Sequence, residues 1–275
     1  MPRTDGELLG AAQDGDRKAL NELLERHQGR VFRFGMKMCG AEEDAKDILQ
    51  ETLLAAARNV DGFRGASSVP TWLYAIARSF CIKKRRTSKF APDHVESLES
   101  AGEAVTEVPD AARGPEEDAS GRQIRGALGD AIAALDPMYR EVLILRDVEG
   151  LSAPEVAEVM GLSIEAVKSR LHRARVAVRD RVAPLLGVTE PSTPAPSDAC
   201  PDVLNLFSQR LEGEISGSVC QELESHLLSC PRCSARCDSL RASLNLCRQA
   251  GDEAVPPRVE HSVRTALQKF LDANA

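Results

Sequence analysis

The chain has 275 residues and a formal net charge of −7, and aromatic residues make up only 4% of it. This length fits two or three modest domains, and the scarcity of aromatic side chains argues against a large β-sandwich or barrel. No run approaches the roughly 18 apolar residues of a membrane span, and the N-terminus is too polar for a secretory signal. We therefore expect a helical, cytoplasmic protein with no membrane partner.

The acidic charge is concentrated in two segments. Residues 88–121 carry nine acids and two bases, and residues 182–275 carry twelve acids and eight bases. The remainder is therefore net positive, and its bases are clustered. A nucleic-acid partner is compatible with this local distribution, although the total charge is negative.

Helical periodicity is the main signal in the first third of the chain. Apolar residues recur at helical spacing over 5–30 and over 42–58. A third helix is expected from Thr71 to Arg86, where it ends in the basic run "KKRR", because Pro70 and the preceding serines are typical of a helix start. The acidic, Ala-, Pro-, Gly- and Ser-rich composition that follows predicts a linker. The expected organisation is a helical domain (1–87), an acidic linker (88–121), a helical domain (122–187), a Pro-rich linker (188–199) and a cysteine-rich domain (200–275).

The second helical domain contains a predicted helix-turn-helix. Ser152 and Ser163 are suited to cap two short helices, and Gly161 fits the left-handed turn between them. Between Lys168 and Arg181 there are six basic residues and one acidic residue, and helical spacing places one of them, Arg175, on an outer face of the second helix. A basic run alone is typical of any solvated helix, but the two caps and the turn together favour insertion into the major groove. The predicted DNA-contacting residues are Ser163, Glu165, Lys168, Ser169, Arg170, His172 and Arg173.

The C-terminal segment has helical patterns at 202–212, 219–229 and 234–248 and holds six of the eight cysteines. His226 and Cys230 share a helix face, and Cys230 and Cys233 form the C-x2-C spacing of two thiolates on one tetrahedral ion. Cys200 is a reasonable fourth ligand. Three more thiols exceed one four-ligand site and favour a soft ion such as zinc, copper or cadmium, or a thiol switch. They are Cys220, Cys237 and Cys247.

Two blocks resemble the extracytoplasmic-function (ECF) sigma factors of bacterial RNA polymerase. "DAKDILQETLL" and "FRGASSVPTWLYAIAR" resemble sigma region 2, and "LDPMYREVLILRDVEGLSAPEVAEVMGLSIEAVKSRLHRAR" resembles region 4. The resemblance implies core RNA polymerase and promoter DNA as partners, with the −10 element bound by region 2 and the −35 element by region 4. It implies polymerase docking by Asp44, Asp47, Gln50 and Glu51, and −10 contacts by Arg64, Trp72, Arg78, Lys83, Lys84, Arg85 and Arg86. For Trp72, a core position is the favoured alternative.

The C-terminal segment resembles the zinc-binding domain of anti-sigma factors, and the whole chain is similar to metal-responsive ECF sigma factors with a cysteine-rich C-terminus. We therefore expect an all-α sigma factor, not an enzyme, whose cysteine-rich domain contacts the sigma domains and controls activity through a bound metal. Redox control is one alternative. A polymerase-independent helix-turn-helix regulator with a structural zinc site is another. A thiol oxidoreductase is weakly supported, since the C-x2-C follows a helical pattern rather than a strand.

Overall fold

The computed structural model describes residues 2–90, 115–187, 200–250 and 254–273. Every regular element within these ranges is a helix, so the expected all-α class is confirmed. The Pro-rich stretch 188–199 and most of the acidic linker lie outside the described residues. No helix in the described part of the chain is long and apolar enough to cross a bilayer.

The N-terminal helices are α1 (Asp5–Gln13), α2 (Arg17–Cys39), α3 (Glu42–Asn59) and α4 (Val69–Phe90). The periodic stretch 5–30 is divided between α1 and α2, because Gly15 adopts a left-handed φ of 92°. Asp16 then caps α2 by accepting from the backbone N–H groups of Lys18 and Ala19. A 3₁₀ turn, η1 (Val60–Gly62), follows α3.

The middle helices are α5 (Pro115–Ala133), α6 (Pro137–Leu143), α7 (Ala153–Met160) and α8 (Ile164–Val182), with the π-helical turn η2 (Ile144–Val148) after α6 and the 3₁₀ turn η3 (Ala183–Leu186) after α8. The acidic composition of residues 88–121 predicted a linker, but α4 continues to Phe90 and α5 already begins at Pro115. Proline at the first helical position explains the start of α5, since its fixed φ suits a helix and its missing N–H costs nothing there.

The C-terminal segment forms α9 (Val203–Leu211), α10 (Gly217–Ser229), α11 (Pro231–Gln249) and α12 (Pro257–Ala273). The first three match the expected helical patterns. The sequence analysis did not predict α12. Its buried residues recur every four positions and form an apolar stripe, which is composed of Val259, Val263, Leu267 and Leu271.

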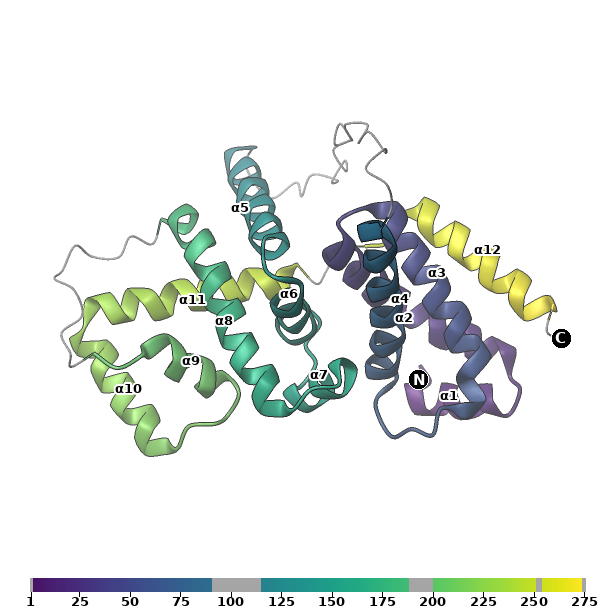
Figure 1. Ribbon diagram of the computed structural model, residues 1–275, viewed down its shortest axis with the longest axis horizontal. Helices are drawn as coiled ribbons and strands as arrows, with labels where there is room; N and C mark the ends of the chain where they lie inside the picture. The colour runs from purple at the N-terminus through teal and green to yellow at the C-terminus, as the bar shows by residue number, and fades with distance from the viewer. Residues whose placement is uncertain (1, 91–114, 188–199, 251–253, 274–275) are drawn as a thin grey trace.

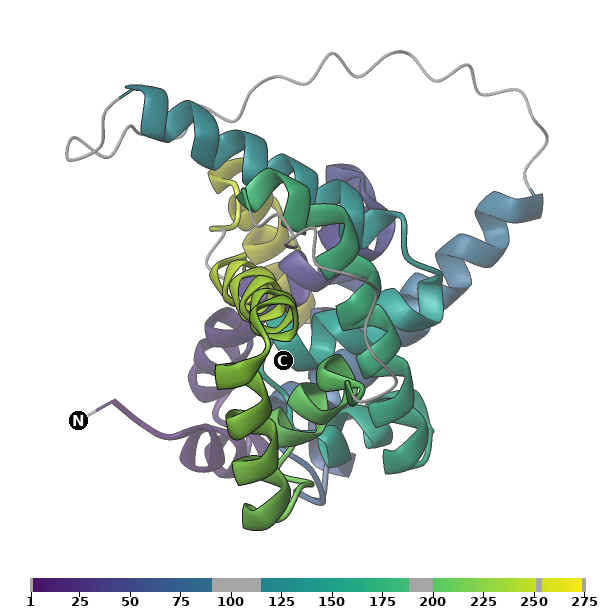
Figure 2. The same cartoon turned by 90° about the vertical axis from the view of Figure 1, so that its left-hand side faces the viewer.

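The helices form two groups that lie side by side (Figure 1). One group contains α1–α4, with α12 packed along α3, and the other contains α5–α11. One large apolar core joins α1–α4 to α6–α8 and includes the α12 stripe. A smaller core joins α9, α10 and α11, and Val176 of α8 packs against it. Figure 2 shows α9, α10 and α11 together, with α5 projecting away from them.

Candidate metal centre and nucleic-acid interface

The helix-turn-helix has the predicted caps and turn. Ser152 forms a capping box with Glu155 at the start of α7, and Ser163 accepts from the backbone N–H of Ala166 at the start of α8. Gly161 between them has a φ of 64°, the left-handed conformation that the turn requires. The sequence analysis of this motif is confirmed, because each signal depends on residues that are neighbours in the chain.

The predicted DNA-contacting residues of α8 divide into two sets. Those on the outer side are exposed: Ser163, Glu165, Ser169 and Arg173. Lys168, Arg170 and His172 are half-buried. Burial lowers the pKa of His172 because it disfavours the imidazolium form. Part of the predicted DNA-binding face is thus covered by the rest of the chain.

An acidic turn between α9 and α10, which we define as Glu212 to Glu214, contacts this helix. The side chain of Glu212 is 5% exposed and accepts from two arginines. Arg175 of α8 donates to it at 2.8 Å, and Arg146 of η2 donates at 3.0 Å. Glu214 pairs with Lys168 at the edge of the same contact.

Arg175 is the centre of this network. Sequence periodicity placed it on the outer face of α8, but its side chain is only 2% exposed. It forms a two-pronged ion pair with Asp147, at 2.8 and 2.7 Å, and donates to Ser208 of α9 at 2.9 Å. An arginine fork satisfies several acceptors in a fixed geometry, so it is the cation best suited to such a buried position. The only sequence signal for a functional role of Arg175 was the high number of basic residues between Lys168 and Arg181.

The predicted −10 helix, α4, faces the helix-turn-helix group. The Tyr74 hydroxyl donates to Glu149 at 2.6 Å, and Arg78 pairs with Glu141 of α6. Thr71 donates to Glu155 of α7 at 3.2 Å. Burial raises the pKa of both Glu141 and Glu149, although their partners oppose that shift.

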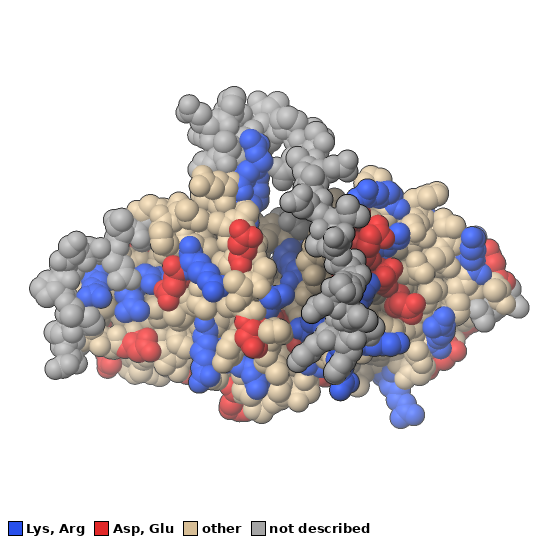
Figure 3. All heavy atoms as spheres, turned by 45° about the horizontal axis from the view of Figure 1, so that its top comes forward, with Lys and Arg blue, Asp and Glu red and all other residues tan. Residues whose placement is uncertain are grey.

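Other predicted region 2 residues lie nearer the surface. Trp72 is half-buried and stacks on Phe63, with ring centroids 4.6 Å apart. Lys84 pairs with both Asp44 and Asp47 at 2.7 Å, which joins the predicted DNA and polymerase residues. Gln50 and Arg85 are half-buried, whereas Glu51, Arg64, Lys83 and Arg86 are exposed. On the face that Figure 3 shows, basic side chains are interspersed with acidic ones.

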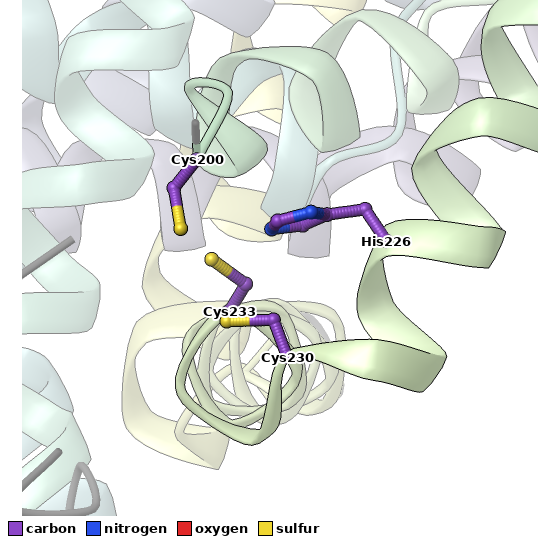
Figure 4. Close-up of side chains that lie close together, drawn as sticks. All are labelled: Cys200, His226, Cys230 and Cys233. Atoms are coloured by element: carbon purple, nitrogen blue, oxygen red, sulfur yellow. The ribbon is translucent and has the colours of Figure 1, made fainter. Parts of the chain in front are cut away.

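Four predicted metal ligands converge in the C-terminal segment. Cys200 precedes α9, His226 lies on α10, Cys230 caps α11 and Cys233 lies one turn further on. Figure 4 shows their side chains pointing toward one another. One ligand atom from each lies within 4.8 Å of all the others. Tetrahedral zinc with Zn–S bonds of about 2.3 Å requires separations of about 3.8 Å, so a small contraction completes the site.

The electrostatics of this cluster also fit a cation. His226 Nε2 is buried and has no hydrogen-bond partner among the described residues. Burial, together with the neighbouring thiols, raises the pKa of Cys233 to about 12. A hydrogen bond from the backbone N–H of Cys233 lowers the pKa of Cys230. Three adjacent thiolates repel one another, and a thiophilic ion removes that repulsion.

The other three predicted metal ligands lie outside this group of four. Cys237 is buried in the small core, and its thiol lies 3.8 Å from the carbonyl oxygen of Val203. Cys247 is fully buried in the large core. Cys220 is half-buried on α10. Spacing alone could not separate these cysteines from the four that converge, because helix packing decides which thiols meet.

Three segments match models of known families. Residues 23–90 match Sigma-70 region 2, residues 125–178 match Sigma-70 region 4, and residues 200–234 match a zinc-finger family. The zinc-finger match contains all four convergent ligands. The chain thus carries region 2, region 4 and the zinc finger in that order.

Curated relatives and solved structures were also found. The ECF RNA polymerase sigma-E factor of Escherichia coli (strain K12) is 33% identical over 190 residues, which are 66% of this chain and 96% of the relative. That of Haemophilus influenzae is 30% identical over 186 residues, which are 66% and 97%.

Among solved structures, CnrH in complex with the cytosolic domain of CnrY has a TM-score of 0.44 and 26% identity, covering 63% of this chain and 93% of that one. RpoE in complex with the anti-sigma factor NepR from Bartonella quintana has a TM-score of 0.43 and 24% identity, covering 58% and 92%. The family-model matches and the curated relatives show that the chain belongs to the ECF sigma factors and carries a C-terminal zinc-finger domain.

Proposed function

We propose that this sigma factor is held in a closed form by its own C-terminal segment, and that metal occupancy of the Cys200, His226, Cys230 and Cys233 cluster sets how firmly it is held. In the open form, region 2 binds the −10 element and region 4 the −35 element. The observation that carries the proposal is the acidic turn. Its Glu212 and Glu214 form ion pairs with basic side chains of the recognition helix α8.

Regions 2 and 4 contact each other directly in the closed form. The two promoter elements are separated by about 25 base pairs, which is about 85 Å along B-form DNA at 3.4 Å per base pair. In the closed form α4 contacts region 4 directly, through Tyr74, Arg78 and Thr71. Regions in such contact do not reach both elements, so promoter binding requires them to separate.

The carboxylates of the acidic turn neutralise basic side chains of region 4. DNA phosphates are bound by lysine and arginine side chains. A carboxylate paired with the same side chain therefore competes directly with DNA. Glu214 occupies Lys168, and Glu212 holds Arg175 and Arg146. Ser169 and Arg173 of α8 stay exposed, so the proposal places the competition at the paired lysine and arginines.

Helix α9 connects the metal cluster to the acidic turn. Cys200 comes directly before α9, and Glu212 is the C-cap of α9. The other ligands belong to α10 and α11, so one ion bound by all four fixes α9 relative to both helices. This fixes the position of Glu212 against Arg175. The bound ion would supply charge neutralisation for the thiolates, and the sulfur-rich donor set suits zinc, cadmium or copper.

The proposal also assigns DNA and polymerase contacts to region 2. In region 2, the exposed Arg64, Lys83 and Arg86 bind the promoter backbone, while the exposed Glu51 contacts polymerase directly and Asp47 exchanges its pair with Lys84 for a polymerase contact. Region 2 also distinguishes this proposal from a polymerase-independent regulator, because a simple helix-turn-helix protein needs no strand-opening domain. Co-purification with core polymerase tests that distinction.

The direct test is transcription in vitro from a promoter that the protein selects from genomic fragments, using purified core polymerase. Zinc-loaded, chelator-treated and cadmium-loaded wild-type chains are compared with Cys230→Ala. Cys220→Ala, outside the cluster, is the matched control. We expect zinc-loaded wild type and Cys220→Ala to give the least transcript, and chelation or Cys230→Ala to raise it. Equal transcript under all metals and from both variants would refute the proposal.

A further inference from the structure

A side chain of α1 holds the connection between α3 and α4. Gln13 is the last residue of α1, and its Nε2 donates to the carbonyl oxygen of Val60 at 2.9 Å and to that of Phe63 at 2.6 Å. A glutamine amide carries two N–H donors, so one side chain can serve both acceptors. The sequence analysis gave Gln13 no role.

The two acceptors are backbone groups at the end of a helix. The last carbonyl oxygens of a helix have no partner within it, and here α3 passes into the turn η1 (Val60–Gly62). Gln13 satisfies two of these oxygens from a helix that is itself fixed. At the other end of α1, Asp5 accepts from Arg26 of α2 at 2.8 Å, and its second oxygen lies 2.8 Å from His27 Nε2.

The α3–α4 loop, which we define as residues 63–68, starts from this anchor. Phe63 is held on two sides, because Gln13 binds its carbonyl oxygen and its ring stacks on Trp72. The next residue, Arg64, is exposed and is one of the predicted −10 contacts. Gly65 then turns the chain with a left-handed φ of 68°. The position of Phe63 therefore sets the point from which Arg64 projects.

The other end of the loop has a different kind of anchor. The Ser68 hydroxyl accepts from the backbone N–H of Thr71 at 3.3 Å at the start of α4. Both hydroxyls donate to Glu155 of α7, at 3.1 and 3.2 Å. Separation of region 4 from region 2 removes Glu155 from these hydroxyls. The Gln13 anchor lies wholly within the N-terminal helices, so it persists after separation.

We propose that Gln13 is a positioning residue for promoter recognition, which holds the α3–α4 loop in the conformation that binds the −10 element. This inference rests on the proposed binding of that element by region 2. It adds α1 to the recognition machinery, although the segment that matches region 2 begins only at residue 23. Gln13 is exposed, so water competes for its hydrogen bonds and the expected effect is moderate.

The first test measures the loop in the full-length chain without DNA. Trp72 is the single tryptophan of the sequence, so its fluorescence reports on the stack with Phe63. Gln13→Met keeps the length of the side chain but has no N–H donor and no charge. We expect stronger quenching of Trp72 by acrylamide and faster hydrogen exchange over residues 61–66 in this variant. The adjacent, exposed Asp14→Asn is the matched control and should behave as wild type.

Wild-type quenching together with wild-type exchange in Gln13→Met would overturn the positioning role. Equal changes in Gln13→Met and Asp14→Asn would overturn it as well, because the effect would then belong to the end of α1 in general.

The second test measures recognition by the full-length chain bound to core polymerase. The probes are two single-stranded oligonucleotides, one with the −10 element of a promoter that the protein selects and one with the same bases scrambled. Gln13→Met should reduce the ratio of the two affinities about fivefold, whereas affinity for a −35 duplex should stay the same.

A merely structural role for Gln13 would lower stability without changing the affinity ratio, so a wild-type ratio in Gln13→Met would overturn the inference. Failure of the proposed function has a different signature. In that case the wild-type complex itself would not prefer the −10 oligonucleotide, and both the −10 assignment and this inference would be lost.

Discussion

The acidic turn contacts region 4, and helix α12 contacts region 2, by different chemistry. On region 4, the acidic turn meets Arg175, Arg146 and Lys168 through ion pairs. On region 2, the α12 stripe enters the apolar core against α2 and α3. Ion pairs are weakened by added salt and by competing ions, whereas the stabilisation from apolar burial depends mainly on the area removed from water.

This difference assigns separate roles to the two contacts. The α12 contact is suited to keep the C-terminal segment attached, and the acidic turn is suited to be released. Two surface pairs reinforce α12 without altering that role: Arg258 pairs with Glu42 at 2.8 Å, and Arg58 lies over the Phe270 ring at 5.1 Å. The four predictions below test this division, beginning with the largest expected effect.

Removing the metal should have the largest effect. Structural zinc contributes about 10 kcal/mol or more to the folding of small domains at neutral pH. The small core of α9–α11 contains few large side chains, so chelation should unfold this segment while regions 2 and 4 stay folded. Hydrogen exchange should show loss of protection over residues 200–250 alone. Full protection after complete zinc removal would show that the cluster is not structural.

Truncation of the α12 stripe should come next. Leu267 is 2% exposed, and Leu267→Ala should cost about 2 to 4 kcal/mol through lost burial and a residual cavity. The expected result is detachment of α12 from α3, detected as proteolysis within residues 257–273. The exposed Gln268→Ala is the matched control and should remain resistant. Equal proteolysis of the two variants would show that the α12 stripe does not attach the C-terminal segment to region 2.

Neutralising the acidic turn should release region 4 with α12 still attached. Glu212→Gln removes the charge from a buried acceptor of two arginines and should cost the closed form about 2 kcal/mol, roughly a 30-fold shift toward the open form. Glu214→Gln should have a much smaller effect, because its pair with Lys168 is partly exposed to solvent. The affinity of each variant for a −35 duplex measures these effects. A larger gain in affinity for Glu214→Gln than for Glu212→Gln would contradict the assigned roles.

The contact between regions 2 and 4 should show the smallest effect, a pH dependence. Burial raises the pKa of Glu149 in the closed form, so the closed form binds a proton more tightly than the open form. Closure is therefore favoured at low pH and weakens as pH rises through that raised pKa. Glu149→Gln, which keeps an acceptor for Tyr74, should flatten this dependence at pH values above the ordinary pKa of a glutamate side chain. An unchanged profile in the variant would assign the titration to another group.

Local signals were sufficient for much of the fold. The caps Ser152 and Ser163 and the turn at Gly161 act on adjacent residues, so the helix-turn-helix was predictable from sequence. The spacing of His226, Cys230 and Cys233 similarly predicted three of the convergent ligands, with Cys200 as the fourth. These features depend on backbone geometry within a few residues.

Features that depend on packing were not predictable. Arg175 was expected to face outward, because a helical pattern does not reveal that Asp147 and Glu212 approach from other elements. The helix α12 was missed although its stripe is regular.

The central claim is that the filled metal cluster holds regions 2 and 4 together. The most direct test is energy transfer between fluorophores introduced by non-cysteine chemistry at the exposed Lys18 and Glu158, one in each half of the chain. We predict high transfer in the zinc-loaded chain and low transfer after chelation or in Glu212→Gln, with Glu214→Gln close to wild type. Transfer that stays the same with zinc, without zinc and in Glu212→Gln would contradict the claim.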